Sequence, residues 1–166
     1  MAKSYQVMNG AAPGAAAPVA VTTSTAIKTM IQLSTSANRE ARIIEWWWEG
    51  DGSAAATPVK VELVRHGTGP CTTVTAYVAA DILKYEPNSV ASQLTLGTSN
   101  SGYTATAEVT PATAPNSIAH FVPPTSGIYL QYPLGREPEM AISTFARIRN
   151  TVTPAVNAYC GVVWEE

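Results

Sequence analysis

Residues 41 to 65 read ARIIEWWWEGDGSAAATPVKVELVR, and this stretch decides the fold class. It holds two runs of β-branched and aromatic residues, 41 to 48 and 58 to 65, separated by a turn that carries Gly50 and Gly52. In the second run apolar residues alternate with charged ones, which is the period of a strand with one buried face. We therefore expect two neighbouring antiparallel strands, joined by a connection too long for a two-residue hairpin.

The rest of the chain repeats this pattern. Short runs of apolar or β-branched residues, each bounded by Gly, Pro, Asn or Ser, recur at intervals of about ten residues. They cover residues 25–33, 72–78, 94–96, 103–109, 118–122, 128–132, 140–149 and 159–164. Only residues 79–86 suggest a helical turn or two. Many short strands with almost no helix predict an all-β fold, an antiparallel β-sandwich or jelly-roll-like domain.

The length of 166 residues suits one domain. Residues 1 to 20 are interrupted by Gly and Pro and have no helical periodicity, so we expect an extended amino-terminal arm and not a signal peptide. Residues 21 to 166 are expected to form a single β-sandwich domain. The sequence has no run of 18 apolar residues, so no membrane partner is expected.

Composition narrows the classes of partner. The chain has 10 Lys and Arg against 12 Asp and Glu, a formal charge of −2, and only 13% charged residues. Because proteins that bind nucleic acid carry a basic surplus, we expect no nucleic-acid partner. The two cysteines, Cys71 and Cys160, fit either a disulfide or two reduced, partly buried thiols, and the sequence leaves both open.

The sequence offers little catalytic chemistry. It contains no nucleophile elbow, zinc motif, phosphate-binding loop or dinucleotide fingerprint. The histidines, His66 and His120, are interpreted as ordinary turn and strand residues. Glu45 and Glu49 would lie about 13 Å apart on an extended strand, which is too far for a glycosidase pair. We expect no enzyme activity, no catalytic residue, no cofactor and no metal ion.

Three consecutive tryptophans, Trp46, Trp47 and Trp48, are the most informative feature of the surface. Because side chains alternate along a strand, we expect Trp46 and Trp48 on one face, together with Ile44. Trp47 is then expected on the opposite face, together with Ile43. Only one face meets the domain core, so at least one indole needs another cover: a further segment of this chain, a ligand or another subunit.

The last third of the chain carries further candidate contact residues. Phe145 falls on the same strand face as Arg147 and Arg149, and Tyr129 points away from the face of its apolar neighbours. Aromatic residues and arginine are enriched in protein interfaces, and the low overall charge favours a contact over a solvated face. The predicted protein interface comprises Trp46, Trp47, Trp48, Tyr129, Arg136, Glu137, Phe145, Arg147 and Arg149. Within it, Arg136 is also a candidate ion-pair partner for the neighbouring glutamates.

Three segments carry a resemblance to a known class of proteins. They read WWWEGDGSAAATPVKVELVR (46 to 65), IYLQYPLGREPEM (128 to 140) and GVVWEE (161 to 166). Together they resemble small β-rich virion proteins of tailed bacteriophages, of the kind encoded among head genes. The resemblance implies a non-enzymatic capsid decoration, or cement, protein, located on the outer surface of the virion and in the host cytoplasm during assembly.

The partners that this resemblance implies are the major capsid protein and further copies of the same chain, with a trimer favoured. The extended arm is similar to the tethers with which some such proteins reach a neighbouring subunit. Two alternatives stay open. One is a tail-tube or minor tail protein. The other is a carbohydrate-binding module, in which the tryptophans and a tyrosine would form a stacking platform.

Overall fold

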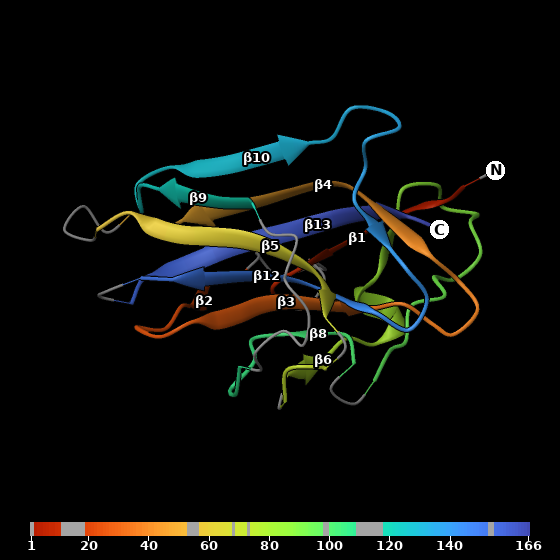
Figure 1. Ribbon diagram of the computed structural model, residues 1–166, viewed down its shortest axis with the longest axis horizontal. Coiled ribbons are helices and arrows are strands. Elements are labelled where there is room, and N and C mark those ends of the chain that lie inside the picture. The colour runs from red at the N-terminus through yellow and green to blue at the C-terminus, as the bar shows by residue number, and fades with distance from the viewer. Residues whose placement is uncertain are drawn as a thin grey trace.

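The computed structural model describes residues 2–10, 19–52, 57–67, 69–72, 74–97, 100–108, 118–152 and 155–166. Within these ranges the chain forms thirteen strands and one short 3₁₀ helix, η1 (Ala79–Asp81). The strands make two antiparallel sheets that pack face to face (Figure 1). The all-β sandwich predicted from the sequence is confirmed. Of residues 79–86, predicted as a helical turn, only the three of η1 are helical.

The first sheet is sheet A, whose longest strands lie behind the second sheet in Figure 1. Its strands are β1 (Ser4–Met8), β2 (Val21–Thr22), β4 (Ala41–Gly50), β7 (Leu83–Lys84), β10 (Gly127–Gln131), β11 (Glu139–Met140) and β13 (Asn157–Glu165). Their order is β10-β4-β13-β1-β7, with β11 paired to β4 and β2 paired to β13. Strand β10 therefore ends sheet A on one side, and the two-residue strand β7 ends it on the other.

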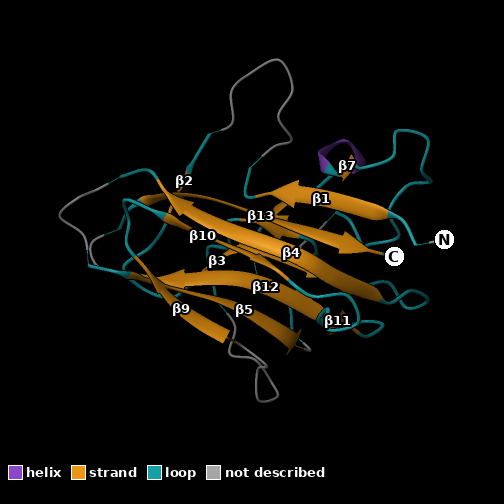
Figure 2. Ribbon diagram, turned by 90° about the horizontal axis from the view of Figure 1, so that it is seen from above, coloured by secondary structure: helices purple, strands orange, loops and turns teal. Residues whose placement is uncertain are grey.

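The second sheet, sheet B, lies in front of sheet A in Figure 1. Its strands are β3 (Lys28–Ser34), β5 (Val59–Gly67), β6 (Thr75–Ala76), β8 (Gly102–Tyr103), β9 (Ile118–Val122) and β12 (Phe145–Thr151). Their order is β6-β8-β3-β12-β5-β9. The two layers are seen side on in Figure 2.

Most successive long strands lie in opposite sheets, and the exception is the step from β5 to β9, which pair within sheet B. The chain passes from β3 to β4 to β5, then from β9 to β10 and from β12 to β13, and changes sheet at each of these steps. The expectation that residues 41–48 and 58–65 are neighbours in one sheet is therefore wrong, because the connection after β4 crosses to the other sheet. Crossing connections of this kind are those of a jelly roll. Because every long strand turns alternate side chains inward, the two sheets share one apolar core, in which Trp46, Trp48 and Trp164 are fully buried.

The amino-terminal segment is part of this core. Strand β1 pairs with both β13 and β7, and it buries Tyr5 and Val7 between the sheets. The Tyr5 ring stacks on the Trp164 indole with centroids 5.8 Å apart. The prediction of a separate arm over residues 1 to 20 is therefore wrong for Ser4–Met8, because alternating apolar side chains make this segment an inner strand. Residues 11–18 of the predicted arm lie outside the described residues.

Strand β4 contains an irregularity that the sequence pattern hides. Val163 of β13 lies opposite Glu45 of β4. The next residue, Trp164, lies opposite Ile43, so Ile44 is the extra residue of a β-bulge. Ile43 consequently points into the core and Ile44 is half-buried. The expected faces of the two isoleucines are thus exchanged, because counting every second residue fails across an inserted one.

The structure decides between the two states left open for the cysteines. Cys71 and Cys160 are both buried and both free, so the structure contains two reduced thiols and no disulfide between them. Burial raises the pKa of the Cys160 thiol well above its ordinary value. Among the residues that the structure describes, no helix has the length and apolarity needed to cross a bilayer.

Candidate interaction face

Aromatic side chains gather on the face of sheet A that points away from sheet B. Trp47 comes from β4, Tyr129 from β10, Tyr159 from β13 and Tyr85 from the turn after β7. The neighbours of Trp47 along β4, Trp46 and Trp48, point into the core, so alternation turns the middle indole outward. We refer to Trp47, Tyr85, Tyr129 and Tyr159 as the aromatic patch.

Trp47 is held flat on the sheet by its two neighbouring strands. Tyr129 lies opposite it on β10, and the two rings stack with centroids 6.4 Å apart and planes 26° apart. On the other side Gly161 of β13 lies opposite Trp47, and the indole occupies the space where a Cβ at position 161 would stand. The glycine thus makes room for the ring. Trp47 is half-buried by its own chain, and its remaining surface faces outward.

A carboxylate stands at the edge of the patch. The hydroxyl of Tyr129 donates a hydrogen bond to Glu45, and the hydroxyl of Tyr85 lies 3.5 Å from the other carboxylate oxygen of Glu45. The hydrogen bond that Tyr129 donates to Glu45 raises the pKa of Tyr129 to about 12. Desolvation raises the pKa of Tyr85, and the charge of Glu45 raises it further. Both phenols therefore stay neutral donors, oriented by one acceptor.

Replacing Glu45 with glutamine should lower the pKa of Tyr129 from about 12 toward its ordinary value of 10.0, because the acceptor loses its charge. A tyrosine whose pKa is raised by folding stabilises the fold below its unfolded pKa. This contribution is lost as the pH rises from 10 toward 12. Ultraviolet titration of tyrosinate measures the shift. The exposed Glu40→Gln variant is the control, and a Tyr129 that still titrates near 12 in Glu45→Gln contradicts the assignment.

Two of the predicted contact residues are core residues. Trp46 and Trp48 have no exposed surface, and the Trp46 indole donates a hydrogen bond to the Tyr132 hydroxyl at 3.2 Å. Their assignment to an interface is therefore wrong: both fall on the inner face, where sheet B covers them. Of the three indoles only Trp47 is left for a partner.

The predicted contact residues of β12 are also covered by the chain itself. Phe145, Arg147 and Arg149 do share the face of β12 that points away from the core, as alternation predicts. However, Phe145 is buried, Arg147 is only 2% exposed and Arg149 is half-buried. Their assignment to a subunit contact is wrong, because segments distant in sequence fold over this face of sheet B.

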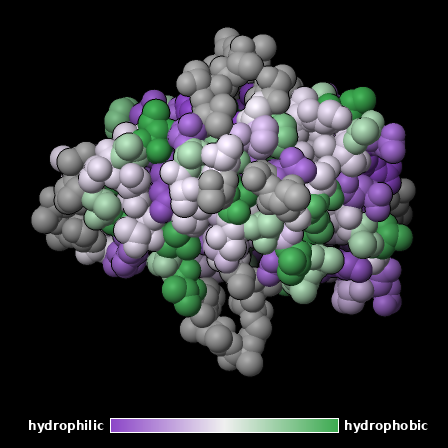
Figure 3. All heavy atoms as spheres, turned by 90° about the horizontal axis from the view of Figure 1, so that it is seen from below, coloured by the Kyte–Doolittle hydropathy of each residue, from purple (hydrophilic) through white to green (hydrophobic). Residues whose placement is uncertain are grey.

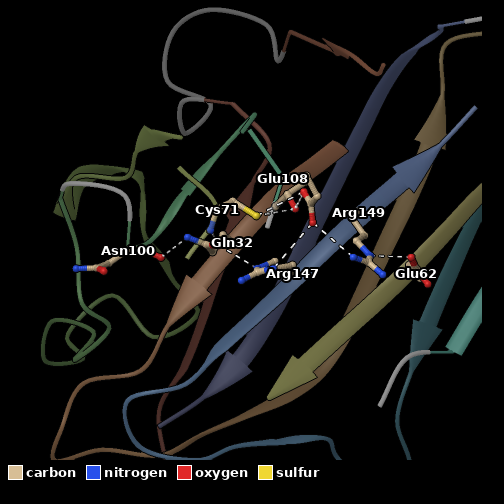
Figure 4. A network of polar contacts seen from close by, with 8 residues as sticks. Gln32, Glu62, Cys71, Asn100, Glu108, Arg147 and Arg149 are labelled. Carbon is tan, nitrogen blue, oxygen red and sulfur yellow. Dashed lines mark hydrogen bonds and ion pairs between the residues drawn. The ribbon is translucent and has the colours of Figure 1, made fainter. Parts of the chain in front are cut away.

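A buried polar network lies there, shown in Figure 4. Its members are Gln32, Glu62, Cys71, Glu108, Arg147 and Arg149. Arg149 donates to Glu62 at 2.7 Å and lies 3.5 Å from Glu108, while Arg147 donates to Gln32 at 3.1 Å and lies 3.9 Å from Glu108. Two guanidinium groups thus face two carboxylates, and the partly exposed Lys60 also lies 3.5 Å from Glu62. The network holds residues 69–72 and 100–108 against the sheet.

Arg136 and Glu137 lie apart from the aromatic patch, in the loop between β10 and β11. With Leu63, Arg65, Ile118, Tyr132 and Pro138 they line a cavity of about 210 Å³. Among the described residues, no ion pair joins Arg136 to Glu137 or to Glu139, so the pairing expected from the sequence is not formed. Glu139 instead pairs with Arg42 at 2.9 Å.

Sequence reasoning missed three residues of the site. Tyr159 alternates with the buried Ala158 and Cys160, so its outward direction was readable from the strand pattern. Tyr85 and Glu45 gave no comparable signal. Tyr85 follows a two-residue strand, and only the fold brings it to a carboxylate 40 positions away.

Within the described part of the chain, no group of three His, Cys, Asp or Glu side chains is placed to hold a metal ion. Comparison of the chain with protein-family models, with curated proteins and with solved structures finds no match.

Proposed function

We propose that this chain is a non-enzymatic structural protein of a tailed-bacteriophage virion, a capsid decoration protein that binds the major capsid lattice through the aromatic patch. The observation that carries the proposal is Trp47, turned outward on sheet A and bordered by exposed tyrosines. The assignment to a phage virion rests on the resemblance of segments 46 to 65, 128 to 140 and 161 to 166 to small β-rich virion proteins.

The patch has the chemistry of a protein contact. Trp and Tyr supply most of the binding energy of many interfaces, and each removes roughly 150–250 Å² from water when buried. Stacking on Tyr129 and the hydrogen bond to Glu45 fix the rings in advance, so little side-chain entropy is lost on binding. On a symmetric lattice, repeated modest contacts of this kind add by avidity.

Replacing Trp47 with alanine should weaken binding to purified heads of the encoding phage on the order of 30-fold, as expected for a central interface tryptophan. Tyr85→Ala, which removes an exposed ring and no core contact, should weaken binding less. Co-sedimentation of the chain with heads measures occupancy, and thermal unfolding checks that each variant is folded.

Leu134→Ala, at a fully solvated leucine outside the patch, serves as the control and should bind as the unaltered chain does. Wild-type occupancy of folded Trp47→Ala and Tyr85→Ala on heads would overturn the proposal. Attachment to tails and not to heads would favour the alternative of a tail protein.

The stacked Trp47 and Tyr129 rings beside the Glu45 carboxylate also favour a second candidate, carbohydrate binding. An aromatic pair can stack on the apolar face of a sugar, and a carboxylate can accept hydrogen bonds from its hydroxyl groups. A glycan array separates the two: binding to a defined glycan that is lost in Trp47→Ala supports this candidate, and no binding to any glycan removes it.

A further inference from the structure

We infer that strand β10 pairs antiparallel with β10 of a second copy of this chain, which joins the two A sheets into one continuous sheet. Strand β10 is the outermost strand of sheet A on its side, and Figure 1 shows it at the top of the molecule with no strand beyond it. Figure 2 looks down onto this edge. Among the described strands, β10 pairs only with β4.

The backbone groups that point outward follow from the pairing with β4. The amide of Tyr132 donates to Ile44, and the carbonyl of Ser126 accepts from Gly50, so even-numbered residues of β10 turn their backbone groups toward β4. Gly127, Tyr129 and Gln131 therefore direct their N–H and C=O groups away from the sheet. This edge offers three donors and three acceptors at the spacing of an antiparallel ladder.

The sequence of β10 carries none of the features that keep sheet edges apart. It reads GIYLQ, with no charge and no proline, over five residues. Natural proteins protect free edges with very short strands, charges, proline or bulges. The opposite edges of both sheets follow this rule, since β7 and β6 have two residues each. Figure 3 shows the side of the molecule on which β6 lies, and there hydrophilic and hydrophobic residues are intermixed.

A two-fold pairing centred on Tyr129 is self-complementary. Tyr129 then lies opposite Tyr129 of the second copy, as a pair that exchanges two hydrogen bonds. On the core side, the half-buried Ile128 lies opposite the half-buried Leu130 of the other copy. On the outer side, the Trp47 and Tyr129 row of one copy continues into the same row of the other. Aromatic cross-strand pairs of this kind stabilise sheets.

Exposed apolar side chains border the seam. Tyr129 is 59% exposed on the outer face of sheet A, and Ile118 of β9, on the same side of the sandwich, is 58% exposed. Phe121 of β9 is 73% exposed but points to the outer face of sheet B, together with Lys60 opposite it, so it lies outside the seam. The apolar surface at the seam is therefore smaller than the about 800 Å² per partner of a standard interface, and backbone pairing supplies most of the contact.

Two variants of Gln131 test the pairing. Gln131→Pro removes one outward N–H and leaves every bond to β4 in place, so the monomer should stay folded while the pair is lost. Gln131→Ala keeps the N–H and should pair like the unaltered chain. Analytical ultracentrifugation of the purified chain should give a mass twice the 17.5 kDa of one copy, and Gln131→Pro should sediment as a monomer with an unchanged thermal unfolding midpoint.

A cysteine pair tests the register. In the symmetric pairing the Cα atoms at position 129 lie about 5.5 Å apart, within the range of a disulfide. Tyr129→Cys should therefore form a covalent dimer on mild oxidation. Gln131→Cys should not, because its own counterpart lies four residues further along, at roughly 13 Å. The native cysteines are buried and do not interfere.

A monomer at all protein concentrations, a trimer, a pair that survives Gln131→Pro, or equal cross-linking at both cysteines overturns the inference. These measurements are made on the free chain. Head binding is measured separately through Trp47 and Tyr85, so failure of the pair and failure of the decoration proposal are distinguishable.

Discussion

Replacing Arg147 with alanine should lower the free energy of unfolding by about 3–5 kcal/mol, because the variant leaves a buried charge network without one of its partners. Arg147 is 2% exposed, donates to Gln32 at 3.1 Å and lies 3.9 Å from Glu108. Without it, two buried acceptors lose a cationic donor. Equilibrium unfolding in urea, followed by tryptophan fluorescence, measures the loss.

Arg42→Ala is the matched control for this effect. Arg42 pairs with Glu139 at 2.9 Å, but the two side chains are 57% and 61% exposed. Exposed ion pairs of this kind contribute about 0–1 kcal/mol. A loss in Arg147→Ala no larger than that in Arg42→Ala would show that the network on sheet B does not stabilise the fold.

Replacing Tyr5 with alanine should cost about 3–5 kcal/mol, as for other large aromatic side chains removed from a core. Tyr5 is buried between the sheets and stacks on Trp164. Removing residues 1 to 8 altogether should leave a chain that does not fold, since the loss approaches the 5–15 kcal/mol that stabilise a whole domain. Circular dichroism and urea unfolding measure both effects.

Gln6→Ala is the control on the same strand, because Gln6 points to the outer face of sheet A and is only half-buried. Its unfolding free energy should change by no more than about 0.5 kcal/mol. A stable, fully folded chain without residues 1 to 8 would show that the segment is a dispensable arm after all.

The strand pattern predicted the direction of Trp47 and missed the bulge beside it. Period-two alternation correctly turned Trp47 away from Trp46 and Trp48. It could not detect that Ile44 is an inserted residue, because a bulge depends on the register with β13 and leaves no local mark in the sequence. The faces of a strand are thus predictable only as far as the next irregularity.

The arginines of β12 show a second limit. Alternation placed Arg147 and Arg149 on the face away from the core, and the structure agrees. Their cover comes from Cys71 and Glu108, which are far away in sequence and reach this face only through the fold. The low overall charge favoured an exposed contact for these arginines, whereas in the folded chain they pair with Glu62 and Glu108.

The amino-terminal strand carried a signal that its surroundings obscured. Tyr5 and Val7 alternate with polar Gln6, which is the pattern of a half-buried strand. The alanines, glycines and prolines that follow at 10 to 18 favoured an unpaired arm for the whole segment. No local feature of the sequence indicates that this segment pairs with β13 on one side and with β7 on the other.

A reconstruction of the assembled virion, with this chain located on the particle, tests the proposed role most directly. We predict that the outer face of sheet A, with Trp47 at its centre, is pressed against the head lattice. A particle in which this chain is bound while Trp47 and Tyr85 face open solvent would contradict the proposal.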